Sequence, residues 1–405
     1  MILPRKRDRR RRVLRWAALT GAGAAAGLLA ALMVGGWTGV ALGAAVLLAA
    51  LALAHPVMIA PPGVPILTYH SVSPDPSWLP WADEIAVHPE TFERHLATLA
   101  KMGCTVLRTA DYVALRAEGR PIPAGAVVLH FDDGYFDNWL FAAPLLKRFG
   151  MAGTFFASLD FIDPGTQLRS APGAAVHGYM NWAELRALDS DPLFDVEPHG
   201  IDHGRVPISG RVVGTLTEEN WRDLAWMQWA NMPGPKHGWY LSASPPAVPL
   251  GTPVPESEGA LAAPCFRDGA LESDAEFRAR VAADLHRCQA EFEERLGRRP
   301  TLFCWPENRV APQSREVARE LGYLATTGGT GRNTAGEPAA ILSRIHVGDR
   351  ALGLRWGPAE ALRLRATVRL FQGNHYWYLV AVPMDLARRL LSRRRTGSGG
   401  LPYRG

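Results

Sequence analysis

Two pairs of reactive side chains stand at the ends of apolar stretches in this sequence. Asp132 and Asp133 end the run "VVLHF" and come before a glycine, while His199 and His203 lie four residues apart just after "FDV". Adjacent carboxylates repel each other and resist burial, so they indicate either a turn or a site. Imidazoles at this spacing can face one point, and each is a good zinc ligand.

Considered together, the two pairs predict a metal-dependent hydrolase. One carboxylate completes a His-His-Asp metal site, and the other stays unligated as a general base for a water molecule that the cation activates. On a continuing strand the two carboxylates would point to opposite faces, but a glycine turn lets both reach one cavity. A nearby divalent cation also makes neighbouring carboxylates tolerable.

The elements around these residues alternate between short apolar runs and helical patterns. The expected strands are 66–72, 105–111, 126–131, 153–159, 194–200, 301–306, 323–328 and 341–347. The expected helices are 88–102, 136–149, 182–189, 274–296 and 311–321. This alternation predicts an α/β fold with a parallel sheet or barrel, whose sites lie where strands end. Residues 204–272 are rich in Pro, Gly and Trp and too long for an ordinary connection, which predicts an insertion or lid.

Charge is concentrated at the two ends of the chain. Residues 1–15 have a net charge of +7 and residues 385–405 one of +5, which leaves −7 for residues 16–384 when the total is +5. An acidic folded part disfavours nucleic acid as a partner, whereas basic ends beside apolar segments suit anionic lipid. The four cysteines form no CxxC pair and are expected to be buried thiols.

The N-terminal apolar segment predicts a transmembrane helical hairpin within residues 16–60. Its strongly apolar part, 16–54, would be ~58 Å long as one helix, about twice a ~30 Å hydrocarbon core. The stretch "GGWTG" in its middle predicts a turn between spans 17–34 and 39–58, and glycines four apart on each span allow close packing. The length of the apolar run disfavours a cleaved signal peptide.

The side of the membrane on which the folded domain lies stays open. The basic residues 1–15 are expected in the cytoplasm, and two spans return the domain to that side. One span plus an interfacial helix would place the domain outside. Residues 351–405 are expected to form an amphipathic, basic membrane-surface segment, with an ordinary docked helix as the alternative.

The two reactive motifs resemble those of the NodB-like polysaccharide deacetylases, carbohydrate esterase family four. "HFDDG" is similar to the first family motif and the His-x-x-x-His of residues 199–203 to the second. The stretches "ILTYHSV" and "HPETFERHLATLAKMGCTVL" are similar to the poly-N-acetylglucosamine deacetylase branch. The resemblance covers about residues 64–350, and it implies that 61–350 form a distorted (β/α) barrel of the polysaccharide deacetylase type.

The resemblance also implies roles for the residues. Asp132 would be the general base, and His70 the general acid. Asp133, His199 and His203 would hold a divalent metal, with Zn²⁺ expected. The reaction would be hydrolysis of N-acetyl groups on an N-acetylhexosamine-containing polysaccharide, by a protein of the bacterial inner membrane whose relatives favour the periplasmic face.

The third family motif departs from its usual Arg-x-Pro-Tyr. The matching stretch is "CWPEN", in which Cys304 replaces the arginine that would orient the base and Glu307 replaces the tyrosine. We expect Trp305, Pro306 and Glu307 to contact substrate, with a backbone N–H at position 307 serving the oxyanion. Near the last strand, Arg344 is expected to line the pocket, and His346 could replace His70 as acid. Structural roles at the core or edge stay open for both.

Other interpretations remain at this point. The aromatic residues of the insertion (Trp226, Trp229, Trp239 and Tyr240) could stack on sugars or pack the insertion onto the barrel. A cytoplasmic domain would favour deacetylation or deformylation of a lipid-linked aminosugar over a secreted polymer. A glycan-binding or assembly protein weakened in catalysis by the altered third motif is a further alternative. Protein partners cannot be named from the sequence.

Overall fold

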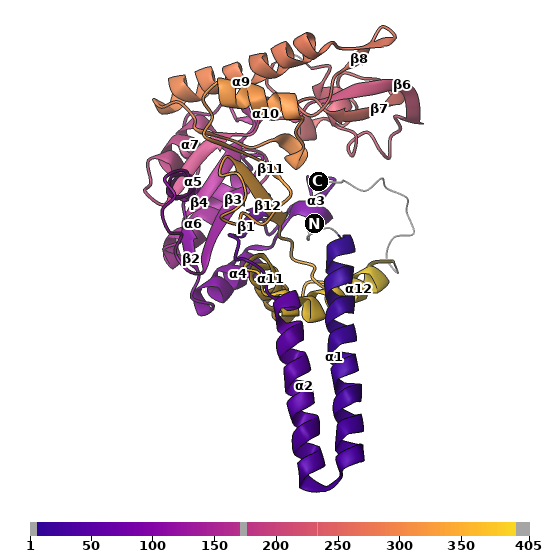
Figure 1. Cartoon of the computed structure of the whole chain (residues 1–405). Helices are drawn as coiled ribbons and strands as arrows, with labels where there is room; N and C mark the ends of the chain where they lie inside the picture. Colours follow the sequence, from indigo (N-terminus) through magenta and orange to yellow (C-terminus); the bar gives the residue numbers. More distant parts are fainter. Residues whose placement is uncertain (1–5, 171–175, 233, 394–405) are drawn as a thin grey trace.

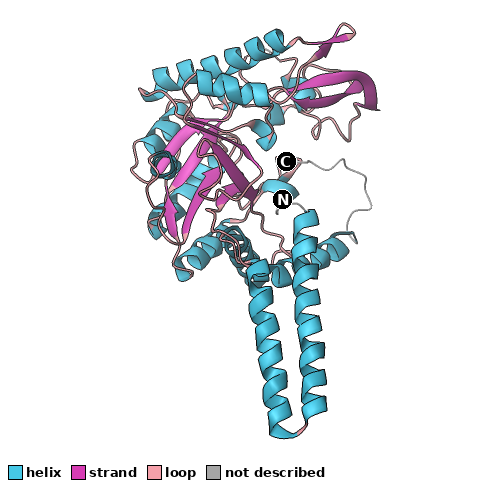
Figure 2. Cartoon of the chain, in the orientation of Figure 1, coloured by secondary structure: helices cyan, strands magenta, loops and turns pink. Residues whose placement is uncertain are grey.

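The central sheet of the protein is a nearly closed parallel barrel. The computed structural model describes residues 6–170, 176–232 and 234–393, so residues 1–5 of the basic N-terminus and 394–405 of the basic tail lie outside the described residues. The strand order is β10-β11-β12-β1-β3-β4-β5, and β2 pairs with β3. The two end strands meet, since the N–H of Cys304 after β10 donates to the carbonyl of Pro198 in β5 (3.1 Å). The expected α/β barrel is confirmed (Figures 1 and 2).

All eight expected strands are present, and most are shorter than predicted. They are β1 (Ile66–Tyr69), β2 (Thr105–Leu107), β3 (Ala126–Phe131), β4 (Gly153–Ala157), β5 (Phe194–Pro198), β10 (Leu302–Phe303), β11 (Ala325–Gly329) and β12 (Ile341–His346). All residues of β1, β3, β4 and β5 are buried. Such burial on both faces is typical of a sheet covered by helices.

The expected helices surround this sheet. They are α4 (Pro89–Lys101), η1 (Asn138–Ala142) continuing into α6 (Ala143–Phe149), α7 (Trp182–Asp189), α9 (Asp274–Leu296) and α10 (Pro312–Glu320). The short α3 (Ala82–Ile85) and α5 (Thr109–Ala117) are additional. The prediction of a strand through residue 111 was wrong, because Arg108 turns to pair with Asp195 and the helix starts at Thr109.

The insertion consists mainly of an antiparallel ribbon, β6 (Arg205–Thr215) with β7 (Pro253–Gly259). It also contains α8 (Trp226–Trp229), η3 (Trp239–Leu241), β8 (Phe266–Arg267) and β9 (Ala270–Leu271). Trp229 and Trp239 are buried in an aromatic cluster with residues of the barrel, and the Trp239 indole N–H donates to the Tyr179 hydroxyl (2.9 Å). These aromatic residues therefore pack the insertion onto the barrel.

Two long apolar helices, α1 (Lys6–Val34) and α2 (Gly36–Met58), form an antiparallel hairpin (Figure 1). The turn lies at Gly35 and Gly36, both with positive φ, at the start of the expected turn. Small residues let the helices approach, since a Cβ on Gly27 would lie 2.7 Å from the carbonyl oxygen of Gly43. Residues 10–34 and 36–58 are each long and apolar enough to cross a membrane.

The C-terminal segment lies between the sheet and the hairpin (Figure 1). It forms α11 (Gly357–Phe371), η5 (His375–Trp377) and α12 (Tyr378–Arg393), where the sequence suggested a single surface segment. The open end of the hairpin docks there. Val13 of α1 packs against a buried cluster of α11 and α12, and Trp16 contacts the Tyr376 ring edge-on.

Candidate active site

The reactive side chains follow the C-terminal ends of β3 and β5. Asp132 and Asp133 come directly after β3, and His199 directly after β5. Asp133 has a φ of 71° and His203 one of 56°, left-handed conformations that are uncommon outside glycine. This turn of the backbone brings both adjacent carboxylates close to His199, and strain of this kind often marks functional positions.

Three of these side chains converge on one point. The Oδ1 atom of Asp133 lies 3.2 Å from Nε2 of His199 and 2.9 Å from Nε2 of His203. The two Nε2 atoms are 2.9 Å apart. Although Oδ1 of Asp133 is buried and this close to both imidazoles, it makes no hydrogen bond of good geometry with the described residues. The two imidazoles and the carboxylate form a donor set that fits a divalent cation such as Zn²⁺.

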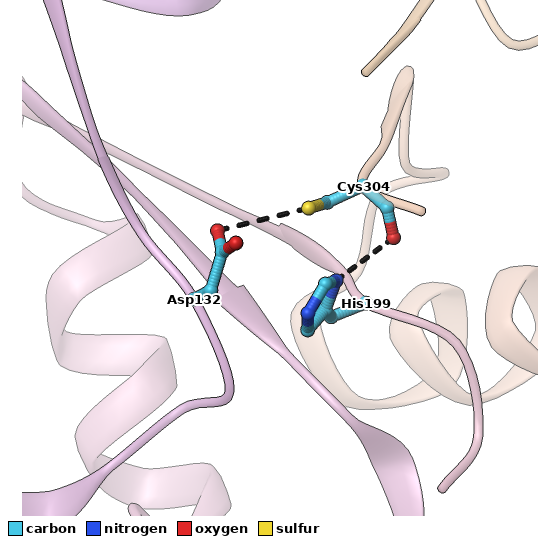
Figure 3. Close-up of side chains that lie close together, drawn as sticks. All are labelled: Asp132, His199 and Cys304. Carbon is cyan, nitrogen blue, oxygen red and sulfur yellow. Dashed lines mark hydrogen bonds between the residues drawn. The ribbon is translucent and has the colours of Figure 1, made fainter. Parts of the chain in front are cut away.

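A hydrogen bond fixes the orientation of His199. Its Nδ1 lies 2.8 Å from the carbonyl oxygen of Cys304 (Figure 3). A carbonyl only accepts, so the proton sits on Nδ1 and the lone pair of Nε2 faces the cation site. Backbone partners of this type orient histidines that bind metals.

A second group, Asp132, His199 and Cys304, does not fit a metal (Figure 3). The Cys304 sulfur lies 3.6 Å from Oδ1 of Asp132. Burial raises the pKa of the Cys304 thiol well above its ordinary value, so the sulfur keeps its proton. Because metals bind the thiolate, Cys304 is a packing residue and weak donor to Asp132.

Asp132 is held by a buried arginine from the opposite side of the site. Nη1 of Arg344, on β12, lies 2.7 and 2.8 Å from the two carboxylate oxygens, and Nε of Arg344 donates to Asn308 (3.2 Å). Burial alone would raise the pKa of Asp132, but Arg344 and nearby histidines hold it well below its usual range. Arg344 thus provides the guanidinium that Cys304 lacks, a pairing that the sequence analysis missed.

The two candidate acids differ in their surroundings. Nε2 of His70 lies 3.9 Å from Oδ2 of Asp132, and its Nδ1 has no partner among the described residues. Nε2 of His346 instead donates to the carbonyl oxygen of Glu84 (2.8 Å), so its proton is already engaged. Burial lowers the pKa of both imidazoles, that of His346 to about 3. On geometry alone, His70 is the better candidate acid.

One cavity of about 390 Å³ opens onto this site, although Asp133 is not among its lining residues. Of the sequence-predicted residues, its lining includes His70, Asp132, His199, His203, Glu307, Arg344 and His346. The prediction for Trp305 is corrected: its side chain is fully buried against Phe303 and does not line the cavity. Pro306 is also buried, packed near Gly200 of the histidine loop. We therefore assign both to the core.

Glu307 lines the cavity. Its carboxylate pairs with Arg205 of the insertion. Its backbone has a φ of 54°, and its N–H makes no hydrogen bond to any described residue. That N–H is a candidate donor to a developing oxyanion.

Comparisons with known proteins agree with this architecture. No family model matches the chain. It is 33% identical over 96 residues to "Putative polysaccharide deacetylase YxkH" of Bacillus subtilis, a match that spans 24% of this chain and about a third (32%) of that protein. The structure resembles the de-N-acetylase of Aggregatibacter actinomycetemcomitans at 18% identity, with a TM-score of 0.50 and coverage of 70% of this chain and 94% of that one. The chain has the polysaccharide deacetylase fold.

A further solved structure is similar at a slightly lower level. It is the BpsB deacetylase domain from Bordetella bronchiseptica, with 21% identity, a TM-score of 0.49 and coverage of 72% of this chain and 97% of that domain.

Proposed function

We propose that the protein is a membrane-anchored, metal-dependent deacetylase that hydrolyses N-acetyl groups of an N-acetylhexosamine-containing glycan, in the manner of the poly-N-acetylglucosamine deacetylase branch. The observation that carries the proposal is that two groups of residues lie side by side in one site. Asp133, His199 and His203 offer a metal donor set, and beside it Asp132 is held ionised by Arg344.

A divalent cation held by Asp133, His199 and His203 would supply Lewis acidity to the acetyl carbonyl and the attacking water. The water oxygen forms the new bond to the carbonyl carbon while Asp132 accepts a water proton. The Glu307 N–H donates to the oxyanion. His70 then protonates the amide nitrogen as the C–N bond breaks, leaving acetate and an amine.

The anchor is proposed to be the α1–α2 hairpin spanning the membrane. The N-terminal part of α1 and the C-terminal part of α2 both contact the C-terminal segment, so the barrel lies on the side of the basic residues Arg10–Arg12 and Arg15. The positive-inside rule then favours the cytoplasmic face of a bacterial inner membrane. This proposal sets aside the periplasmic placement that the family resemblance favoured.

The test is acetate release by the full chain from short β-1,4- and β-1,6-linked N-acetylglucosamine oligomers, with and without added zinc. The account expects zinc-dependent release that Asp132→Asn abolishes. A folded, zinc-loaded protein that binds the oligomers and releases nothing would support the alternative of a glycan-binding protein.

A further inference from the structure

The active-site cavity does not end at the metal site but continues to the C-terminal helices. Its lining includes His199 and His203 at one end and residues of both C-terminal helices at the other: Arg363, Leu364 and Thr367 of α11, and Asp385 and Arg388 of α12. Since α11 and α12 also receive the open end of the hairpin, one cavity joins the reacting groups to the layer nearest the membrane anchor.

A series of neighbouring groups marks this path. The rings of His70 and His346 are 5.2 Å apart, and His346 bonds the backbone carbonyl of Glu84 on α3. The Arg388 guanidinium of α12 lies close enough to Glu84 to oppose the rise that burial causes in its pKa. His346, expected as an alternative acid, therefore lies between the reacting groups and the C-terminal layer.

The two faces of α12 are of opposite character. Asp385 and Arg388 face the cavity, while Leu386 and Leu390 are 58% and 57% exposed. Leu379 and Val382 continue this apolar face at helical spacing. The helix α12 packs beside a hairpin whose helices are long enough to cross a membrane. Exposed leucines on such a helix are typical of a helix that lies in the lipid interface.

The charges of the cavity wall near these helices are largely paired. Arg363 lies 2.9 Å from Asp385, and Arg350 lies 2.5 Å from Asp83. This wall has no excess of positive charge, because its ion pairs are neutral overall and lie among the apolar side chains Ile345, Val347 and Leu364. It therefore does not form a site for a strongly anionic polymer. Such a wall suits the hydroxyl and amide groups of a short saccharide.

We propose that the substrate is an N-acetylated hexosamine attached to a membrane lipid, presented from the bilayer surface through the part of the cavity that α11 and α12 line. This inference rests on the proposed deacetylase function and specifies its substrate. The acetyl-bearing sugar occupies the metal end of the cavity, the linkage passes between His346 and α12, and the hydrocarbon remains in the bilayer along the exposed face of α12.

The test compares two probes with the full chain reconstituted in phosphatidylcholine vesicles. They are dodecyl N-acetyl-β-D-glucosaminide, which inserts into the vesicle, and methyl N-acetyl-β-D-glucosaminide, which stays in water. The variant Leu386→Gln/Leu390→Gln keeps good helix formers but removes two apolar side chains. Leu271→Gln, 56% exposed on β9 of the insertion, is the matched control.

We expect the double variant to lose about 10-fold or more of kcat/KM on the dodecyl glycoside and to change less than about 2-fold on the methyl glycoside. The control should leave both unchanged. The hairpin anchors every variant, so simple colocalisation with the substrate cannot produce this difference. Equal losses on both glycosides, or no loss on the dodecyl glycoside, would overturn the inference. If the zinc-loaded wild type hydrolyses neither glycoside nor the oligomers, the deacetylase function itself fails.

Discussion

Replacing Arg344 by methionine tests how the base is kept ionised. Both partners of the Arg344–Asp132 pair are almost fully buried, with exposures of 6% and 2%. Removing one member of a buried pair leaves an uncompensated charge and costs about 3–5 kcal/mol. We therefore expect Arg344→Met to lose about this much stability at pH 7, or to avoid part of the loss by protonating Asp132.

The sign of the pH dependence follows from the direction of the pKa change. In the wild type the pKa of Asp132 is depressed, so the pair stabilises the fold above the ordinary aspartate pKa and this stability is lost on acidification. In Arg344→Met only the nearby histidines oppose the effect of burial, and the pKa of Asp132 rises. The stability that Arg344→Met lacks relative to the wild type should then decrease by up to about 1.4 kcal/mol per pH unit as the pH falls from 7 to 5.

Thermal and urea unfolding of the full chain in detergent between pH 5 and pH 8 measures this deficit, and the pH–rate profile provides a second readout. The acidic limb of kcat/KM should move upward by about 2 pH units or more. Adding Asp132→Asn to Arg344→Met should recover about 2 kcal/mol, since the two sites are in contact.

Arg315→Met is the matched control, because Arg315 is partly buried but donates only to the carbonyls of Thr327 and Gly328. The reasoning is refuted if Arg344→Met loses stability with the same pH dependence as Arg315→Met and leaves the acidic limb in place.

Three further outcomes are expected. His203→Ala should lower zinc affinity by at least about 100-fold, measured as metal content after dialysis, with near-wild-type secondary structure by circular dichroism; unchanged zinc content would contradict the assigned ligand set. Burial raises the pKa of Asp137 to about 7, so the folded protein retains a proton that the unfolded chain releases, and wild-type stability should fall as pH rises from about 4 to about 7. Asp137→Asn can keep the hydrogen bond with Ser71 and should show a shallower decline than the wild type in a pH series of melting temperatures, since Glu197, Asp284 and Glu360 also have pKa values raised to about 7; parallel curves would refute the assignment. Gly27→Leu should separate the two hairpin helices, since even a Cβ at position 27 would lie 2.7 Å from the Gly43 carbonyl oxygen. This variant should impair membrane insertion in a protease-protection assay. Gly21→Leu, at a position with open space around it, should leave insertion unchanged.

The sequence predicted the barrel well because its strands are short apolar runs followed by polar residues. The histidine spacing and the paired acids likewise predicted that one carboxylate joins the two histidines, and the family resemblance implied that it is Asp133. Asp133 and Gly134 both have positive φ, and the Asp-Gly pair that indicates this turn is a local signal.

Contacts between residues distant in sequence were harder to predict. The pairing of Arg344 with Asp132 joins positions 212 apart, and no local pattern specifies which strand supplies the guanidinium. Trp305 was expected at the substrate because it lies within the third motif, but its ring is fully buried against Phe303. The link between the cavity and α12 depends on tertiary packing that has no periodic signal.

The central claim is tested most directly by counting both products of the proposed reaction. Full-length protein loaded with zinc is incubated with N-acetylglucosamine oligomers, and released acetate and new primary amines are measured in the same samples. The account predicts equal amounts of the two, lost on chelation and absent in Asp132→Asn. Folded, zinc-loaded protein that produces neither product from the oligomers or from the lipid-attached glycoside would contradict it.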